Sequence, residues 1–480
     1  MTSAAQSGDE AELGVMGRGL EPIEVFMRKM SRDPHCRSTA LAVFLLDQAP
    51  DWDRFVHTWD RVSRLVPRFR QRLVDPPLGL PAAWVLDPDF DLDYHLRRIR
   101  APEPGTLRQL FDMGRTMLMA DLDPVRPLWE VTLVEGLEGG RAALLQKADH
   151  ALGDGQGGLR MMQILLDSTR EAEAGPMPSA PEPEDSRPVA VLRTALGERL
   201  RAAARSPQNA GRLAGAAGSA LLRPAAAVSG ALEFVASAGR MLAPLTTTPP
   251  SPLLQNRSLS FHFDVLEVGF DDLNRAGKAV GGTINDCFLA ALAGALGRYH
   301  ERLGSPLEDA RIGMPISTRR EGDALASNHF SVAFLAAPAA IADPRARIER
   351  IHELVRQARS EPALPAIEGA AAALRLLPDT LFQAAMSAGT PDVSASTVAG
   401  FDIDLYIAGA KVERMYGFGP MAGGAMLIGL VSMFGVCCVT LNLDPAAFTE
   451  ADLFVDCLRE SFEEILDLGG PNEGVATPAR

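Results

Sequence analysis

The sequence has fewer basic than acidic residues, and this shortage limits the partners that the protein is expected to have. It contains 47 Lys and Arg residues against 61 Asp and Glu residues, which gives a formal net charge of −14 and a pI near 5.2. A protein that binds nucleic acid needs a basic face for the phosphates. We therefore expect no nucleic acid as the main partner.

Cysteine is also scarce, and its spacing excludes the common structural zinc motifs. The five cysteines form no Cys-x-x-Cys pair; they are Cys36, Cys287, Cys437, Cys438 and Cys457. Such an odd, scattered set predicts buried thiols in a reducing compartment rather than a disulfide framework. Apart from one histidine discussed below, the histidines show no metal-ligand spacing; they are His35, His57, His95, His262, His300, His329 and His352. We expect no metal and no cofactor.

The sequence also lacks an evident targeting segment. The first fifteen residues include Asp9, Glu10 and Glu12 and have neither a basic nor an apolar stretch, so we expect no secretory signal and a cytoplasmic location. The segment Met421–Leu443 has no charged residue and is longer than the ~20 residues that cross a bilayer. Because several glycines interrupt it, we predict two buried strands with a turn near 432–435 instead of one spanning helix.

The length of 480 residues predicts two domains, because single cores rarely exceed roughly 250–300 residues. Alternating strand-like and helix-like segments on both sides of a central stretch indicate an α/β protein. We expect a disordered N-terminus at 1–16, an N-terminal lobe at 17–170, a crossover linker at 171–256, a C-terminal lobe at 257–467 and a disordered tail at 468–480. In the N-terminal lobe, Gly139-Gly140 predicts a β-hairpin turn between strands ending near 137 and beginning near 142.

The crossover is rich in Ala, Pro and Arg. Residues 187–240 contain eight arginines against Glu198 and Glu233, a local charge of +6 in an acidic protein. A basic, apolar helix of this kind is typical of peripheral contact with an anionic membrane or lipid droplet surface. The favoured alternative is a solvated linker, because alanine inserts weakly into lipid.

The segment most informative about chemistry is Lys147–Gly158. A predicted strand ends at His150, a glycine-rich turn follows, and a helix begins with apolar residues on one face. The strand fixes the imidazole, and the glycines allow backbone or substrate to come close. Asp154 either caps the helix or pairs with an arginine. Taken alone, the pattern also fits a helix cap beside a core histidine.

Further segments accompany this motif in a consistent order. They are Asp123–Glu130, Gly282–Asp286, Met314–Arg319, Leu405–Ala410 and Ser432–Gly435. Together they resemble the bacterial wax ester synthase/diacylglycerol acyltransferase family over roughly residues 17–466. The resemblance implies a two-lobed, chloramphenicol acetyltransferase-like fold of the coenzyme A-dependent acyltransferases, with a channel between the lobes that reaches the histidine.

The sequence departs from the family pattern in two places. The family motif begins with two histidines, and here the first is Asp149; Ser396–Gly400 reads Ser-Thr-Val-Ala-Gly where the family has Ser-Asn-Val-Pro-Gly. In a continuous strand, Asp149 and His150 point to opposite faces. Asp149 is therefore expected to change the position or the pKa of His150, and the second change bears on the acceptor side of the site.

The resemblance assigns a role to each candidate residue. His150 is the general base, Asp154 and Gly155 belong to the same catalytic motif, and Arg319 is the partner of Asp154. Asn285 is the first candidate for stabilising the oxyanion and Ser432 the second. The alternatives are a helix cap for Asn285 and a turn residue for Ser432. Asp149 and Trp129 are candidates for lining the channel, although packing is favoured for Trp129.

The expected function is transfer of a long-chain fatty acyl group from acyl-CoA, a substrate rather than a cofactor, to diacylglycerol or a fatty alcohol. Two alternatives remain. One is an acyltransferase of the same fold with a different acceptor. The other is a lipid-binding relative without enzymatic activity, for which the departures at Asp149 and Ser396–Gly400 argue.

Overall fold

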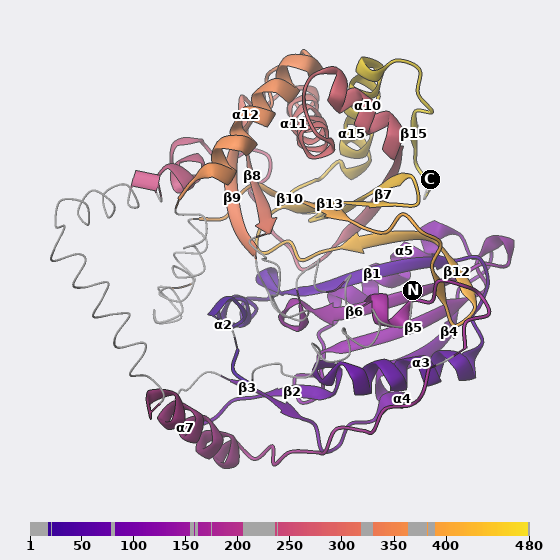
Figure 1. The fold of residues 1–480 in the computed structure, drawn as a ribbon. Coiled ribbons are helices and arrows are strands. Elements are labelled where there is room, and N and C mark those ends of the chain that lie inside the picture. Colours follow the sequence, from indigo (N-terminus) through magenta and orange to yellow (C-terminus); the bar gives the residue numbers. More distant parts are fainter. Residues whose placement is uncertain are drawn as a thin grey trace.

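The computed structural model describes residues 18–20, 22–77, 82–153, 158, 162–173, 175–204, 236–237, 239–317, 330–362, 382 and 389–478 (Figure 1). The described secondary structure gathers into two lobes, each built around one large sheet with helices packed on it. This arrangement confirms the α/β class expected from the sequence.

The first lobe contains a six-stranded sheet with the order β11-β12-β1-β6-β5-β4. Its strands are β1 (Thr39–Leu46), β4 (Leu96–Arg100), β5 (Trp129–Glu135), β6 (Ala142–Asp149), β11 (Tyr406–Ile407) and β12 (Ala410–Phe418). The helices of this lobe are α2 (Pro22–Met30), α3 (Trp52–Leu65), α4 (Leu92–His95) and α5 (Leu107–Met119). A separate hairpin consists of β2 (Gln71–Val74) and β3 (Ala83–Leu86).

The two faces of the first sheet bury different partners, because successive side chains of a strand point to opposite faces. Phe44 of β1 packs on Trp59 of α3, on the outer face. Val43 belongs to another cluster, which contains Phe111 of α5 and Phe263 of the second lobe. The face covered by α5 is therefore the one that meets the second lobe.

The second lobe contains a seven-stranded sheet with the order β15-β7-β14-β13-β10-β8-β9. Its strands are β7 (His262–Gly269), β8 (Asp309–Ser317), β9 (Phe330–Pro338), β10 (Val393–Ala399), β13 (Met426–Met433), β14 (Val436–Leu443) and β15 (Val475–Ala476). The core of this lobe lies between the sheet and its helices, which are α10 (Phe270–Ala279), α11 (Ile284–Arg302), α12 (Pro344–Ser360) and α15 (Ala451–Leu466). The crossover contributes α7 (Pro188–Ala204).

The two lobes are not separate stretches of chain. Strand β12 lies in the second half of the sequence but pairs antiparallel with β1, with Tyr416 opposite Val43. In Figure 1 the orange strand β12 lies beside the indigo strand β1. The expected C-terminal lobe at 257–467 thus contains a segment, 406–418, that completes the sheet of the N-terminal lobe.

The apolar run Met421–Leu443 forms two strands, as predicted. β13 and β14 pair antiparallel through a tight turn at Phe434 and Gly435, whose φ angles are +52° and +75°. Two consecutive residues with positive φ are typical of the turn that matches the twist of a hairpin. In the described part of the chain, no single helix is long and apolar enough to cross a membrane; α10 and α11 pass that test only as a bent pair, and most of α11 is buried in the core.

Two further expectations can be compared with the structure. All five cysteines are buried and form no disulfide, as predicted. The prediction of a disordered tail at 468–480 is wrong for its described part. Val475 pairs with Val268 at the edge of the second sheet, since β7 leaves one side open for a short strand. The expected disordered segment at 1–16 lies outside the described residues.

Candidate functional site

His150 lies at the point where the first sheet ends against the second lobe. Strand β6 stops at Asp149, and residues His150–Leu152 form one short turn of 3-10 helix, η4. The backbone N–H of His150 donates to Ser38 O at 2.9 Å, so the turn is fixed to the start of β1. The imidazole is half-buried, and its centroid lies 6.2 Å from the ring of Phe330, the first residue of β9.

The carboxylate of Asp149 anchors this turn. One oxygen accepts a hydrogen bond from Ala151 N at 2.8 Å, which makes Asp149 the N-cap of η4. The other oxygen accepts from Ser38 Oγ at 2.7 Å, and Ser31 Oγ donates in turn to Ser38 Oγ at 2.9 Å. Asp149, which replaces the first histidine of the motif, thus holds the backbone that carries His150.

Trp129 does not line a channel, and the sequence-based assignment as a channel residue is corrected. Its side chain is 0% exposed and stacks between Trp59 and His95, with centroid distances of 5.3 and 4.3 Å. Its indole N–H donates to Phe69 O at 2.8 Å. A buried, satisfied indole of this kind is a packing residue, which was the favoured interpretation from the sequence.

Asn285 is not the cap of the helix that carries it. Thr283 is the N-cap of α11 and forms a capping box with Asp286, so the alternative role expected for Asn285 is filled by its neighbours. The amide oxygen of Asn285 accepts a hydrogen bond from Thr397 Oγ1 at 2.9 Å. Its amide nitrogen lies 3.7 Å from Met314 Sδ.

Thr397 belongs to the Ser-Thr-Val-Ala-Gly segment in which this sequence departs from the family pattern. It lies on β10, and its contact with Asn285 was not foreseen from the sequence. The hydroxyl of Thr397 reaches the amide of Asn285 at the start of α11. In the sequence, only the departure from the family pattern pointed to this residue.

Asp286, the second residue of the Asn-Asp motif, has a structural role. Its carboxylate is buried and accepts hydrogen bonds from Thr283 N and Thr283 Oγ1, each at 2.8 Å. His352 Nδ1 of α12 also lies 2.8 Å from it. These contacts fix the first turn of α11 and therefore the backbone of Asn285.

Ser432 lies within strand β13 and not in the turn that follows it. It is opposite Ala399 of β10, and Gly400 N donates to Ser432 O at 2.9 Å. Paired residues share a face, and so do residues two apart on one strand. Ser432 therefore lies on the same face of the second sheet as Thr397. Among the described hydrogen bonds, none joins His150 to Asn285 or to Ser432.

A buried cation lies close to the motif. Lys147 of β6 has almost no exposed surface, and its ammonium donates to Ala120 O at 2.6 Å. Burial is the main cause that lowers the pKa of Lys147 below its usual value, and the nearby Glu130 opposes this shift. Sequence analysis did not single out this residue, because a lysine on a strand is usually exposed.

A small hollow opens at the seam between the lobes, next to the motif. It is lined by residues of both lobes, among them Arg37, Thr39, Phe261 and Asn442. Thr39 is directly opposite Asp149 in the pairing of β1 with β6.

The remaining predicted site residues, Asp154, Gly155 and Arg319, lie outside the described residues, so the pairing of Asp154 with Arg319 stays a prediction.

Comparison with known proteins gives matches along almost the whole chain. Residues 20–288 match the model of the wax ester synthase/diacylglycerol acyltransferase catalytic domain, and residues 326–466 match the C-terminal domain of the same family. A Mycobacterium tuberculosis protein provisionally named a diacylglycerol O-acyltransferase is 41% identical over 473 residues, which cover 97% of this chain and 95% of that protein. A second protein of that organism, similarly named, is 30% identical over 449 residues, covering 89% and 92%.

Solved structures with the same architecture confirm the predicted two-lobed fold. The wax ester synthase/diacylglycerol acyltransferase from Marinobacter aquaeolei VT8 aligns with a TM-score of 0.63 at 21% identity, covering 94% of this chain and 100% of that one. The starter condensation domain of rhizomide synthetase, in complex with C8-CoA and Leu-SNAC, aligns with a TM-score of 0.59 at 11% identity, covering 99% and 97%.

The anchoring contacts of Asp149 predict a loss of stability when its carboxylate is removed. We expect Asp149→Ala to lower the free energy of unfolding by about 1–2 kcal/mol, because Ala151 N and Ser38 Oγ both lose an acceptor. Urea unfolding measures this change. Asp149→Asn is the matched comparison. Its single amide oxygen can still cap Ala151 N but cannot also accept from Ser38 Oγ, so we expect a smaller loss than for alanine. Equal stability of the alanine and asparagine variants would contradict the anchoring role.

Proposed function

Because the chain belongs to the wax ester synthase/diacylglycerol acyltransferase family, it is an acyltransferase, and we propose that His150 is the general base of its reaction. The observation that supports this proposal is the position of His150. It is the retained histidine of the motif, it is held by backbone contacts at the end of β6, and it faces Phe330 of the other lobe. Its imidazole is half-buried and thus keeps some access to the surroundings.

In the proposed reaction, His150 takes the proton of an alcohol as the alcohol oxygen attacks the thioester carbonyl. A neutral alcohol is a weak nucleophile at pH 7, and a positioned base with a pKa near ~6.5 relieves this weakness. The carbon–sulfur bond then breaks, and the coenzyme A thiolate leaves and recovers the proton from the imidazolium. The ester forms without a covalent intermediate on the enzyme.

The negative charge that develops on the carbonyl oxygen requires hydrogen-bond donors aimed at it. We assign this role first to the amide nitrogen of Asn285. Thr397 Oγ1 donates to the amide oxygen of Asn285. This contact orients the amide, whose nitrogen is the donor. Ser432 is the second candidate, on the same sheet face as Thr397. Asp154 is proposed to orient the turn of His150 together with Arg319.

The proposed substrates are a long-chain acyl-CoA and a lipid alcohol, either diacylglycerol or a fatty alcohol. The names of the relatives support this choice: two are provisionally called diacylglycerol O-acyltransferases, and the aligned Marinobacter aquaeolei protein is called a wax ester synthase/diacylglycerol acyltransferase.

Acyl transfer with and without His150 tests the proposal. The protein is incubated with palmitoyl-CoA and either diacylglycerol, hexadecanol or no acceptor, and free thiol and ester are measured. We expect His150→Ala to lower kcat by about 10²–10⁴-fold, the usual contribution of a general base. His57→Ala, a half-buried histidine on α3, is the matched control and should retain activity. Full activity of His150→Ala would remove the proposed base; no turnover by the unaltered protein with any acceptor would favour the non-enzymatic alternative.

The oxyanion role of Asn285 predicts a second set of rate changes. We expect Asn285→Ala and Asn285→Asp to lower kcat by about 10²–10³-fold with little change in KM, because both remove the donor. The aspartate variant keeps an acceptor for Thr397, so it separates the two contacts of the amide. We expect Thr397→Val to cause a smaller loss and Thr397→Ser to restore activity. Near-normal kcat in Asn285→Asp would transfer the role to Ser432.

We further propose that the crossover touches the cytoplasmic surface of a membrane. Val191 of α7 is buried among Val74 and Val85 of the β2–β3 hairpin. On the same helix, Val189 and Leu196 are 70% and 45% exposed. Exposed apolar residues on a basic helix are suited to the interface of an anionic bilayer. Much of the basic stretch, including 205–235, lies outside the described residues.

Flotation on vesicles tests this contact. We expect the protein to float with vesicles that contain anionic phospholipid, and to do so less at high salt, because salt screens the arginines. The double variant Val189→Glu/Leu196→Glu should float markedly less, while Val125→Glu, an exposed valine elsewhere, should float normally. Undiminished flotation of the double variant would leave the crossover as a solvated linker.

A further inference from the structure

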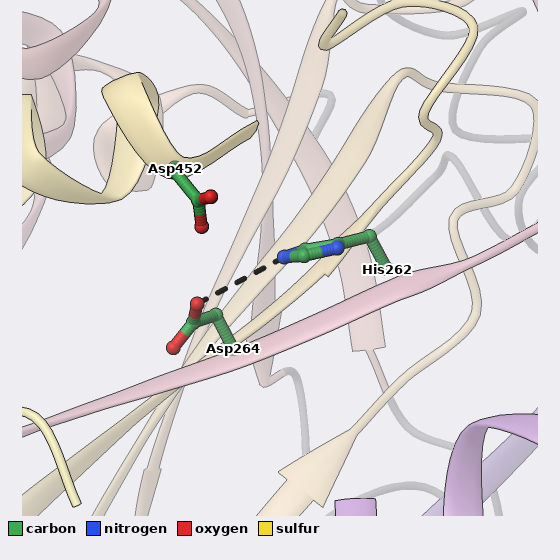
Figure 2. Close-up of side chains that lie close together, drawn as sticks. All are labelled: His262, Asp264 and Asp452. Atoms are coloured by element: carbon green, nitrogen blue, oxygen red, sulfur yellow. Dashed lines mark ion pairs between the residues drawn. The ribbon is translucent and has the colours of Figure 1, made fainter. Parts of the chain in front are cut away.

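Three side chains meet where β7 and α15 begin (Figure 2). His262 is the first residue of β7, Asp264 follows two residues later, and Asp452 is the second residue of α15. Figure 2 shows the imidazole and the two carboxylates pointing toward a common centre. One nitrogen or oxygen atom from each of the three side chains lies within 4.8 Å of the others.

This cluster is separate from the acyltransferase site. Along β7, the alternate residues Phe263 and Val265 belong to the cluster of residues between the lobes. Leu266 and Val268 belong instead to the core beneath the helices of the second lobe. Because residues two apart share a strand face, His262 and Asp264 lie on this helical side. They therefore face away from the first sheet, which carries His150. Along the second sheet, His262 is level with Met426 of β13, six residues before Ser432.

The carboxylate of Asp264 has few hydrogen-bond donors among the described residues. The side chain of Asp264 is 3% exposed, and its Oδ1 accepts a hydrogen bond only from the adjacent Val265 N, at 2.8 Å. Its Oδ2 lies 3.8 Å from His262 Nε2, too far for a hydrogen bond. In the described part of the chain, no lysine or arginine forms an ion pair with Asp264.

His262 provides the second, independent observation. Its Nε2 atom is buried and has no hydrogen-bond partner among the described residues. Buried polar atoms are almost always satisfied, and a buried carboxylate without a nearby cation is costly. An imidazole nitrogen and a carboxylate oxygen that face the same space without a hydrogen bond between them are suitable ligands for a metal ion.

We propose that His262, Asp264 and Asp452 bind one divalent transition-metal ion of the zinc type. Zinc bonds to histidine nitrogen and carboxylate oxygen are about 2.0–2.2 Å long, so two ligand atoms of a tetrahedral ion lie roughly 3.3–3.6 Å apart. The distance of 3.8 Å between His262 Nε2 and Asp264 Oδ2 exceeds this spacing by a few tenths of an ångström, which small side-chain rotations close. Asp452 is exposed at the start of its helix, and a rotation of its side chain completes the set.

The ligand types decide the class of metal. Imidazole suits zinc and other transition metals, whereas magnesium and calcium prefer oxygen ligands alone. Water would fill the remaining position.

The ion would tie the first turn of α15 to β7. β7 is the strand through which the crossover enters the second sheet, and α15 is the last long helix. The role is structural and independent of acyl transfer. Sequence spacing predicted no metal here because Asp452 is remote in the chain from His262 and Asp264.

Zinc binding by the full-length, untagged protein tests the site. The protein is freed of metal with a chelator, dialysed, and titrated with ZnCl₂ against a chromophoric zinc chelator. We expect one equivalent to bind, and expect His262→Ala and Asp452→Asn to weaken binding by about tenfold or more, since each removes a direct ligand. The matched control is His35→Ala, because His35 also lies beside an aspartate, with its Nδ1 3.0 Å from Asp33 Oδ1. This variant should bind zinc as the unaltered protein does.

A thermal measurement on the same variants gives the second readout. An ion that binds only the folded chain raises its Tm, so zinc should raise the Tm of the unaltered protein and of His35→Ala but not of His262→Ala. Circular dichroism before addition of metal verifies that each variant is folded. Binding of Mn²⁺ at the same residues would support the proposal. Equal zinc affinity of His262→Ala and the unaltered protein, no zinc binding at all, or preference for Mg²⁺ or Ca²⁺ over zinc would overturn it.

Discussion

The antiparallel pairing of β1 with β12 is the interaction on which the arrangement of the two lobes depends. β12 completes the first sheet, although it comes from the half of the chain that forms the second. The same strand also packs on the second lobe: Tyr416 donates a hydrogen bond to Glu267 Oε1 of β7 at 2.7 Å, and Phe418 stacks on Phe263 with centroids 3.9 Å apart. Because the first sheet is complete only when the C-terminal half has folded, the lobes are not independent folding units.

This constraint extends to the proposed base. β1 pairs with β12 on one side and with β6 on the other, and His150 follows β6 directly. The backbone of His150 is tied to Ser38 at the start of β1. Asn285 is set by different means, through the capping box of α11 and the hydroxyl of Thr397. The two proposed catalytic groups therefore belong to rigid elements of different lobes. The contacts of β12 with both lobes determine their relative position.

Local structure was largely predictable from the sequence, and contacts between distant segments were not. The two strands within Met421–Leu443 and the turn at Gly139-Gly140 between β5 and β6 lie where they were expected, because apolar runs and turn glycines are local signals. No local sequence signal predicts that β12 pairs with the first sheet, since an apolar strand fits either sheet. Packing was favoured for Trp129 from the sequence, but its stacking partner Trp59 could not be named, because that contact joins distant segments. For Asn285, the sequence offered an oxyanion donor or a cap; the contact with Thr397 required the strand order of the second sheet.

The replacement of a histidine by Asp149 has a physical explanation that preserves the base. A carboxylate has two acceptor oxygens. Here one oxygen caps the turn, and the other accepts a hydrogen bond from Ser38 Oγ. An imidazole at the same position offers at most one acceptor nitrogen, so it would satisfy only one of these donors. The aspartate thus ties the turn more firmly to β1. One oxygen is occupied by Ala151 N within the turn and the other by Ser38 Oγ before β1, so Asp149 acts on His150 by fixing its backbone.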